Sequence, residues 1–205
     1  MKKLLFIALA FFTLLIGIDA RAQLVATAGF LSNSETENKS YASHLEGFYI
    51  GAKYQYPLDH VLTNLSIVPG VNLSIAGGSG SSVYYGAKVT ELALNIPVMA
   101  AYTYRLNDMI QLFGQAGPTI QFGLSQNAAY KSSGFKTTLD CYQDNSNADA
   151  RNRMNLFFGL GLGVEVYDQY QLLVGIDLGL LQMSSDPGMM SITRDLFHIG
   201  AGYRF

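Results

Sequence analysis

The chain has 205 residues, of which 49% are hydrophobic and only 14% are charged, with a formal net charge of −2. Soluble domains carry about 25% charged residues, so this chain has fewer charged side chains than such a domain. High hydrophobicity with low charge excludes a disordered chain, and the composition also excludes a coiled coil. The charge balance gives no basic surface for nucleic acid. A single cysteine excludes a disulfide framework and a cysteine-based zinc site. What remains is a β protein rich in glycine and tyrosine.

The first 22 residues have the pattern of a secretory signal peptide. Lys2 and Lys3 precede an apolar stretch over 4–18, and small residues at Ala20 and Ala22 mark a cleavage site before Gln23. An uncleaved anchor is the alternative, but the apolar stretch is shorter than the ~20 residues of a spanning helix. The junction has no cysteine, which excludes a lipoprotein. We therefore expect a barrel domain over 23–205 after export, with no transmembrane helix.

From residue 24 onward, apolar residues alternate with small or polar ones, which is the period of β-strands. Several of these stretches are as long as the ~9–11 residues that a tilted strand needs to cross a bilayer. We expect eight strands near 24–31, 47–56, 65–75, 91–105, 110–124, 155–166, 171–180 and 197–205. Short connections are expected at 57–63, 105–109 and 167–170, and long ones at 32–46, 77–88, 125–152 and 183–194.

Alternating short and long connections are typical of outer-membrane barrels, which have short periplasmic turns and long extracellular loops. The sequence therefore predicts an all-β fold, an eight-stranded antiparallel up-and-down transmembrane barrel of the OmpA/OmpX type. A secreted lipocalin-type barrel is the alternative, but its outer face would need many charges, and the polar face here is mostly Gly, Gln, Asn and Ser. Pro69, Pro97 and Pro118 lie within the strand patterns and predict local bulges.

Four stretches carry a resemblance to a known family: 91–104, 114–124, 158–166 and 197–205. With them the chain resembles the PorT-type outer-membrane β-barrel domain family of Gram-negative envelopes. The resemblance implies that the final aromatics, Tyr203 and Phe205, belong to the signal read by the barrel-assembly machinery. It brings no catalytic residues, and it implies a role in a secretion apparatus for only a few members.

Charged side chains on the polar face of the strands should lie in the lumen and pair there, because an unpaired buried ion is very costly. Arg105, Glu165 and Arg204 are expected to form one cluster at the short-turn end, and Asp177 is expected to meet His198 at middle depth. Such a network braces and blocks the barrel, or acts as a gate or proton-linked switch. The predicted lumen network comprises Lys53, Glu91, Arg105, Glu165, Asp177, His198 and Arg204.

The sequence shows no enzyme, cofactor or metal signature. The histidines have no Ser/His/Asp spacing, and the stretch 77–82 lacks the last glycine of a nucleophile elbow. The acidic and amide residues of 144–149 lack the glycine and the closing glutamate of a calcium loop. Within the expected long loop 125–152, Cys141 either stays a thiol or bridges to a second molecule.

We therefore expect a non-catalytic barrel in the outer membrane of a Gram-negative bacterium that displays extracellular loops as a structural or interaction protein. Its expected partners are the lipid bilayer, the barrel-assembly machinery and an extracellular or periplasmic protein, but no nucleic acid. The alternative is a component of a secretion apparatus. A narrow channel and a lipid-modifying enzyme are less favoured.

Overall fold

A computed structural model describes residues 23–37, 40–58, 61–79, 88–132, 135–142, 151–183 and 192–205. The predicted signal peptide lies outside these residues. The described part contains nine strands, and none of its elements is a helix long and apolar enough to cross a membrane. The strands are β1 (Gln23–Glu37), β2 (Ser40–Pro57), β3 (Leu65–Ser79), β4 (Lys88–Arg105), β5 (Ile110–Ser132), β6 (Phe135–Asp140), β7 (Met154–Val166), β8 (Tyr170–Gly179) and β9 (Ile192–Arg204).

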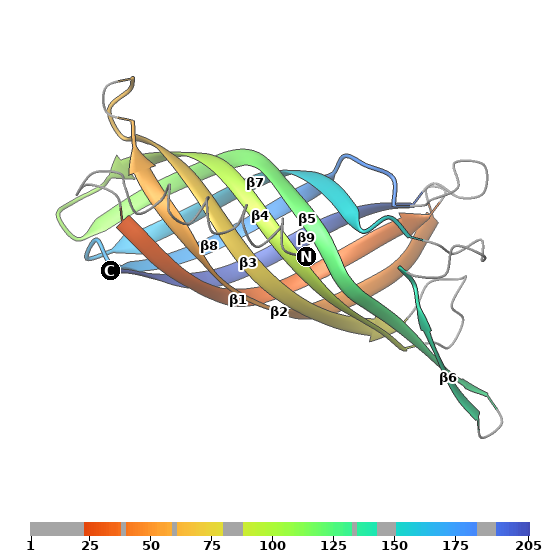
Figure 1. Cartoon of the computed structure of the whole chain (residues 1–205). Helices are drawn as coiled ribbons and strands as arrows, with labels where there is room; N and C mark the ends of the chain where they lie inside the picture. Colours follow the sequence, from red (N-terminus) through yellow and green to blue (C-terminus); the bar gives the residue numbers. More distant parts are fainter. Residues whose placement is uncertain are drawn as a thin grey trace, which may run out of the picture.

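Eight of these strands form a closed antiparallel barrel (Figure 1). The hydrogen-bonded order runs β4-β3-β2-β1-β9-β8-β7-β5, and an additional pairing of β4 with β5 closes the ring. The ninth strand, β6, pairs with the distal part of β5, so it extends the barrel wall without adding a strand to it. The predicted eight-stranded up-and-down barrel is confirmed.

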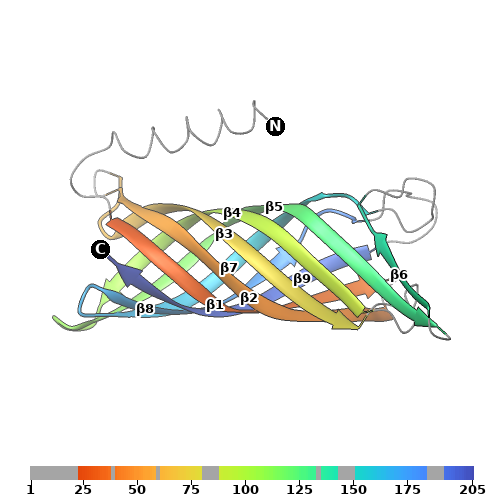
Figure 2. The same cartoon turned by 60° about the horizontal axis from the view of Figure 1, so that its bottom comes forward.

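The two ends of the barrel differ. At one end, which we call the short-turn end, β1 begins and β9 finishes, and short turns join β2 to β3, β4 to β5 and β7 to β8. At the opposite end, the loop end, β5 and β6 form a hairpin that reaches past the other strands (Figure 2). In outer-membrane barrels these ends face the periplasm and the cell exterior, respectively.

Strand alternation divides the side chains into a lumen set and an outward set. In β7, for example, Asn155 and Phe157 are buried in the lumen, whereas Leu160 and Leu162 point outward. The outward side chains form a continuous apolar surface, which would be unstable in water and suits contact with lipid. Outward apolar side chains that are more than 40% exposed include Ile50, Val71, Leu73, Leu112, Leu160, Leu162, Leu172, Ile176 and Ile199.

Glycines make room in the lumen for large side chains from facing strands. The ring of Tyr49 lies over Gly29 and Gly200, and a Cβ added to Gly200 would stand 2.0 Å from the Tyr49 hydroxyl oxygen. Because no side chain fits in that space, glycine at these positions allows the narrow barrel to hold a buried aromatic ring.

The strands at the loop end are longer than the sequence predicts. The expected connection 32–46 is mostly strand, because β1 continues to Glu37 and β2 starts at Ser40. The expected loop 125–152 likewise begins with the β5–β6 hairpin. Outside the bilayer both faces of a strand can be polar, so the apolar alternation fades while the backbone ladder continues.

The predicted bulges at the three prolines are wrong. Near Pro69 in β3 and Pro97 in β4 the ladders skip residues but resume in the same register, and the ladder of β5 with β7 runs unbroken through Pro118. The register shift between β4 and β5 lies elsewhere, between Leu92 and Ala93. Gaps in the ladders therefore accommodate these prolines, which have no N–H group to donate.

Candidate functional site

The lumen is closed near the loop end by a buried arginine. Arg194, on β9, has no solvent-exposed side-chain surface. Its guanidinium donates to Glu35 Oε1 of β1 at 2.6 Å, to Glu91 Oε1 of β4 at 2.7 Å and to Gln121 Oε1 of β5 at 3.1 Å. One side chain thus joins strands from opposite walls of the barrel. The carboxylates offset its charge, which a buried arginine requires.

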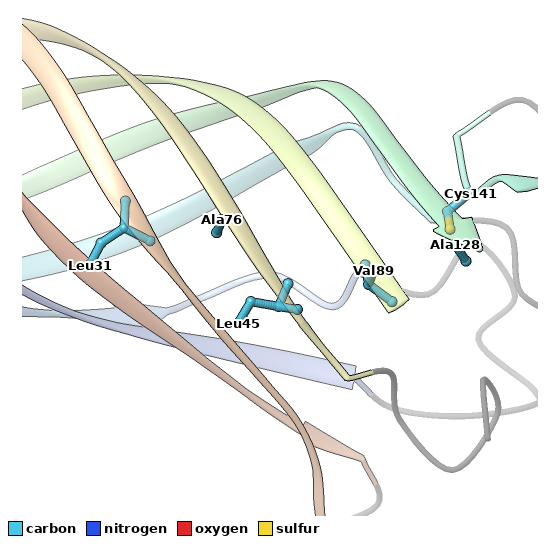
Figure 3. Packing of buried hydrophobic residues seen from close by; sticks show 6 residues of the cluster. All are labelled: Leu31, Leu45, Ala76, Val89, Ala128 and Cys141. Atoms are coloured by element: carbon cyan, nitrogen blue, oxygen red, sulfur yellow. The ribbon is translucent and has the colours of Figure 1, made fainter. Parts of the chain in front are cut away.

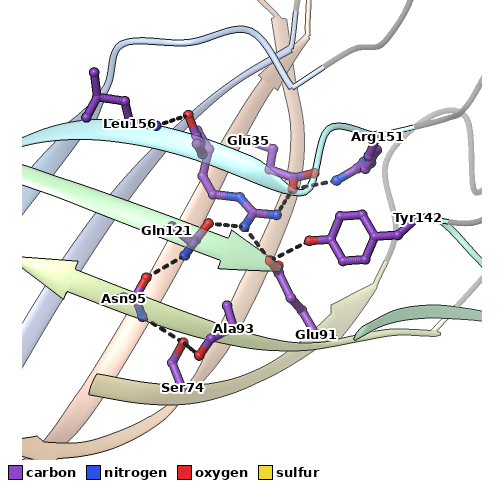
Figure 4. A network of polar contacts seen from close by, with 11 residues as sticks. Glu35, Ser74, Glu91, Ala93, Asn95, Gln121, Tyr142, Arg151 and Leu156 are labelled. Carbon is purple, nitrogen blue, oxygen red and sulfur yellow. Dashed lines mark hydrogen bonds and ion pairs between the residues drawn. The ribbon is translucent and has the colours of Figure 1, made fainter. Parts of the chain in front are cut away.

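Two residues between β6 and β7 complete this set (Figure 4). Arg151 donates to Glu35 Oε1 at 2.7 Å, and the Tyr142 hydroxyl donates to Glu91 Oε1 at 3.2 Å. Burial and the negative charge of Glu91 raise the pKa of Tyr142, so the phenol keeps its proton. We call this set the loop-end network: Glu35, Glu91, Gln121, Tyr142, Arg151 and Arg194.

The loop-end network continues toward the middle of the barrel through uncharged side chains. Gln121 donates to Asn95 Oδ1 at 2.9 Å, and Asn95 donates to Ser74 Oγ at 3.0 Å. Ser74 in turn donates to the carbonyl of Ala93 at 3.3 Å. Buried amides and hydroxyls are stable when each finds such a partner, and this chain orients the Gln121 oxygen toward Arg194.

An apolar cluster packs around the same end of the lumen (Figure 3). Cys141 belongs to this cluster and is only 5% exposed, whereas the sequence places it in an exposed loop. The adjacent Tyr142 ring lies under the guanidinium of Arg153, 5.2 Å from its centroid. Cys141 and Tyr142 therefore hold the base of the β5–β6 hairpin in the barrel mouth. The cluster comprises Leu31, Leu45, Ala76, Val89, Ala128 and Cys141.

A second set of polar contacts lies at the short-turn end. Glu165 Oε2, on β7, accepts from Arg204 of β9 at 2.5 Å and from Gln171 of β8 at 2.5 Å. Arg204 also donates to Gln55 of β2 at 2.7 Å. We call Gln55, Glu165, Gln171 and Arg204 the short-turn network. The predicted contact between Glu165 and Arg204 is present in the structure.

Arg105 does not join this network, contrary to the sequence prediction. It is the last residue of β4, and it pairs with Asp168 at the rim, 3.4 Å away, with side-chain exposures of 57% and 50%. Asp168 also accepts from Gln111. A charge at the mouth of a barrel is solvated by water and does not need the buried partner that the prediction assumed.

The remaining predicted lumen charges lie between the two networks. Asp177 Oδ2 is 3.6 Å from His198 Nδ1, as the strand positions predict. The His198 ring makes an edge contact with Tyr49, with centroids 6.2 Å apart. Lys53 lies over the ring of Phe113, 5.4 Å from its centroid.

The two residues of the expected assembly signal lie at the end of β9. Tyr203 and Phe205 make edge-to-face ring contacts 5.1 Å apart, and Tyr203 packs in the same way on Tyr170 at 5.5 Å. Phe205 is 73% exposed on the outer surface. Gln23 is the first residue of β1, and Ala22 lies outside the described residues.

Sequence reasoning missed the centre of the loop-end network. Glu35, Tyr142, Arg151 and Arg194 were all assigned to long connections. The signal was present in β9, because Arg194 precedes Leu196 and His198 by even steps and so shares their inward face. Extending the alternation beyond its apolar part would have placed Arg194 in the lumen.

His44, the histidine at the loop end, has polar neighbours on β1. His44 contacts Ser32 at 2.8 Å and Ser34 at 3.3 Å. Its ion-pair partner, Glu46, is itself exposed. Groups of three or more His, Cys, Asp or Glu residues that could hold a metal ion are absent from the parts of the chain that the structure describes.

Comparison with known proteins agrees with the fold. Among solved structures, neisserial surface protein A is 11% identical with a TM-score of 0.51, over 90% of this chain and 99% of that one. Ail, the attachment invasion locus protein of Yersinia pestis, is 16% identical with a TM-score of 0.48, over 90% and 99%. The outer membrane enzyme PagL is 11% identical with a TM-score of 0.42, over 85% and 97%.

At these identities the neisserial protein shows the fold alone. No curated protein matches the chain. The sequence profile of the outer membrane protein beta-barrel domain, however, matches residues 19–205, nearly the whole sequence. The chain therefore belongs to the outer membrane protein beta-barrel domain family.

Proposed function

We propose that this protein is a closed, non-catalytic outer-membrane barrel that presents its loop end to a protein partner outside the cell. The observation that carries the proposal is the position of Arg194, fully buried across the lumen between Glu35 and Glu91. This contact favours a brace over an aqueous pore. An eight-stranded barrel has little lumen space beyond its side chains, so the outer surface is where a partner can bind.

The β5–β6 hairpin supports a role for the loop end. It rises beyond the barrel, and its base is held by the buried side chains of Cys141 and Tyr142. Thr138, on β6, is exposed to solvent. A strand pair anchored in a rigid barrel presents its surface with little loss of conformational entropy on binding.

The narrower family resemblance leads to a second candidate. PorT-type barrels include secretion components, and such a component needs contacts with periplasmic or inner-membrane proteins. The short-turn end would carry those contacts, and Leu106 and Met109 in its β4–β5 turn are exposed apolar residues. Both candidate functions require export through a signal peptide that is cleaved between Ala22 and Gln23. Both also require insertion into the outer membrane of a Gram-negative bacterium.

Site-specific photo-crosslinking on intact cells tests the two candidates against each other. A photoreactive residue at Thr138 samples the loop end, and the same residue at the exposed Asp108 of the β4–β5 turn samples the short-turn end. We expect a specific crosslinked protein from position 138 only. Crosslinks from position 108 alone, together with loss of secreted proteins in a deletion strain, would reject display and support secretion.

A further inference from the structure

One region of the barrel wall has interrupted strand pairing. Between β2 and β3 the ladder stops at the pair of Lys53 with Gly70 and resumes at the pair of Tyr56 with Ile67. The ladders of β3 with β4 and of β4 with β5 are interrupted in the same way. In the described residues, the other ladders of the wall skip no pair, apart from the register shift beside Glu35 at the loop end. Each interruption contains a proline, and these are Pro69, Pro97 and Pro118.

The three interruptions lie side by side at one depth of the wall. Val98 of β4 pairs with Pro69 of β3, and its register position on β5 is Pro118. Pro97 is the chain neighbour of Val98. Proline donates no backbone hydrogen bond, and a closed barrel offers it no free edge. Lipid offers no water to replace the missing bonds. We call this region, Pro69, Pro97, Val98 and Pro118, the proline gap.

The proline gap is a weakly paired part of the wall and not a hole. A Cβ added to Gly117 would stand 2.2 Å from the carbonyl oxygen of Val98, so β4 and β5 are in close contact there. The strands must therefore move apart to open the wall. Local opening costs least where few ladder hydrogen bonds hold a segment, so the proline gap is where this barrel opens most readily.

A cavity of about 80 Å³ lies in the lumen behind the proline gap, and we call it the chamber. Pro97 borders the chamber together with Val68 and Met99, which are each 5% exposed. Leu173 of β8 and Leu196 of β9 border it from elsewhere in the ring. The weakly paired part of the wall thus coincides with unfilled space on its inner side.

The chamber suits a small apolar molecule. Most of its lining surface is apolar, and its charged side chains have neighbours of their own. Asp177 Oδ2 lies 3.6 Å from His198 Nδ1, and Lys53 Nζ lies 5.4 Å from the centroid of the Phe113 ring. An apolar cavity of about 150 Å³ binds benzene or xenon. The chamber, about half as large, therefore fits apolar molecules smaller than benzene.

Charged networks obstruct the route to the chamber along the barrel axis. Arg194 contacts Glu35 and Glu91 at the loop end, and Arg204 contacts Glu165 at the short-turn end. An apolar molecule that passed either network would separate buried ion pairs, which is costly. The route through the proline gap breaks no ion pair and begins in lipid, where apolar molecules dissolve.

We propose that the proline gap is a lateral port through which small apolar molecules exchange between the bilayer and the chamber. The port is closed in this conformation and opens when β4 separates from β3 or from β5. This goes beyond the proposed display function, which concerns the loop end and requires only that the lumen be closed to water.

Xenon tests the class of ligand, because it is small, apolar and known to enter apolar cavities. In a crystal of the full barrel pressurised with xenon, we expect a xenon atom in the chamber beside Met99. A chamber that takes up no xenon would overturn the proposal.

Alkylation of a thiol inside the chamber tests the route. The variant Met99→Cys, in a Cys141→Ala background, is placed in lipid vesicles and treated with iodomethane or with iodoacetate. Each rate is divided by the rate of the same reagent with the unfolded variant. We expect iodomethane to react and iodoacetate to be excluded, because a carboxylate enters lipid at a high cost. Equal relative rates would show access from water and would overturn the proposal.

Restoring the ladder should close the port. Pro97→Val and Pro118→Val together return backbone N–H groups on both sides of position 99. The iodomethane reaction should slow at least about fivefold, the factor that corresponds to one typical ladder hydrogen bond. Ile176→Val, a lipid-facing change on β8 where the ladders are unbroken, is the matched control and should leave the rate unchanged. An unchanged rate in the double proline variant would overturn the proposal.

Discussion

Three arginine–carboxylate pairs of the barrel differ in how far solvent reaches them. In the loop-end network, Arg194 and Glu35 have side-chain exposures of 0% and 2%. At the short-turn end, Arg204 and Glu165 are at 11% and 3%, and the rim pair of Arg105 with Asp168 is half exposed. Because water weakens ion pairs and also solvates a broken partner, burial should rank the pairs by their effect on stability.

The networks also differ in what they connect. The short-turn network joins β7, β8, β9 and β2, which lie along one arc of the wall. The loop-end network reaches from β1 and β9 to β4 and β5 on the far side. Each contact of the short-turn network therefore joins strands one or two places apart in the ring, whereas the contact of Arg194 with Glu91 joins strands four places apart, across the barrel.

The largest effect is expected from breaking the ion pairs that Arg194 makes across the lumen with Glu35 and Glu91, which we call the cross-brace. Arg194→Met keeps most of the side-chain volume but removes the positive charge beside Glu91, which stays in the lumen with the Tyr142 hydroxyl donating to it. Loss of one member of a buried ion pair destabilises by about 3–5 kcal/mol. The free energy of unfolding of the protein refolded in lipid vesicles, followed by circular dichroism, measures this loss.

Leu196→Met is the matched control for that substitution. Leu196 is the next inward residue of β9 and is 8% exposed. A volume-conserving change of this kind costs less than about 1.5 kcal/mol. If Arg194→Met were no more destabilising than Leu196→Met, the cross-brace would add nothing to the free energy of unfolding beyond ordinary packing in the lumen.

Glu165→Gln should have a smaller effect on the same measurement. The amide keeps a hydrogen-bonding group toward Gln171 but removes the negative charge beside Arg204. Arg204 retains Gln55 and is partly exposed, so its guanidinium is not stranded. We expect a loss of about 1.5–3 kcal/mol, the range for a hydrogen bond to a charged group. A loss equal to that of Arg194→Met would contradict the expectation that the more deeply buried ion pair contributes more to stability.

The membrane-spanning part of the fold was predictable because lipid imposes a strict pattern on it. Leu160 and Ile176 must be apolar outside, and Asp177 and Glu165 must be inside, so period-two alternation locates them. The pairing of Asp177 with His198 followed from neighbouring strands at equal depth. For these residues, the local sequence alone predicts whether the side chain faces the lipid or the lumen.

The loop-end network was not predictable in the same way. Glu35 and Arg194 stand 159 positions apart, and Arg151 follows a long connection, so their meeting depends on barrel closure. The outward residues next to Glu35 and Arg194 are polar, namely Ser34, Thr36, Thr193 and Asp195, so the apolar alternation that marks a strand is lost there. Arg105 shows the opposite error, because alternation assigned it to the lumen although its strand ends at the rim.

Tyr142→Phe separates the anchoring of the hairpin from the charge balance of the network. It removes the hydroxyl that donates to Glu91 at 3.2 Å but leaves both arginines in place. We expect a loss of about 1–2 kcal/mol, since the acceptor keeps Arg194. A spin label at the exposed Thr138 should also become more mobile, and unchanged mobility would show that Tyr142 does not hold the hairpin.

The smallest effect is expected at the rim. Arg105→Ala breaks a pair whose members are 57% and 50% exposed, and such surface pairs contribute about 0–1 kcal/mol. Any loss should shrink as salt is raised, because the Debye length falls from about 8 Å at physiological salt to about 3 Å at 1 M. The effect of Arg194→Met should persist in the same series, because its charges are shielded from solvent ions. Unfolding of wild type and both variants across a salt series gives this contrast. Equal salt dependence for the two variants would mean that water reaches Arg194, and the barrel would then be open at its loop end.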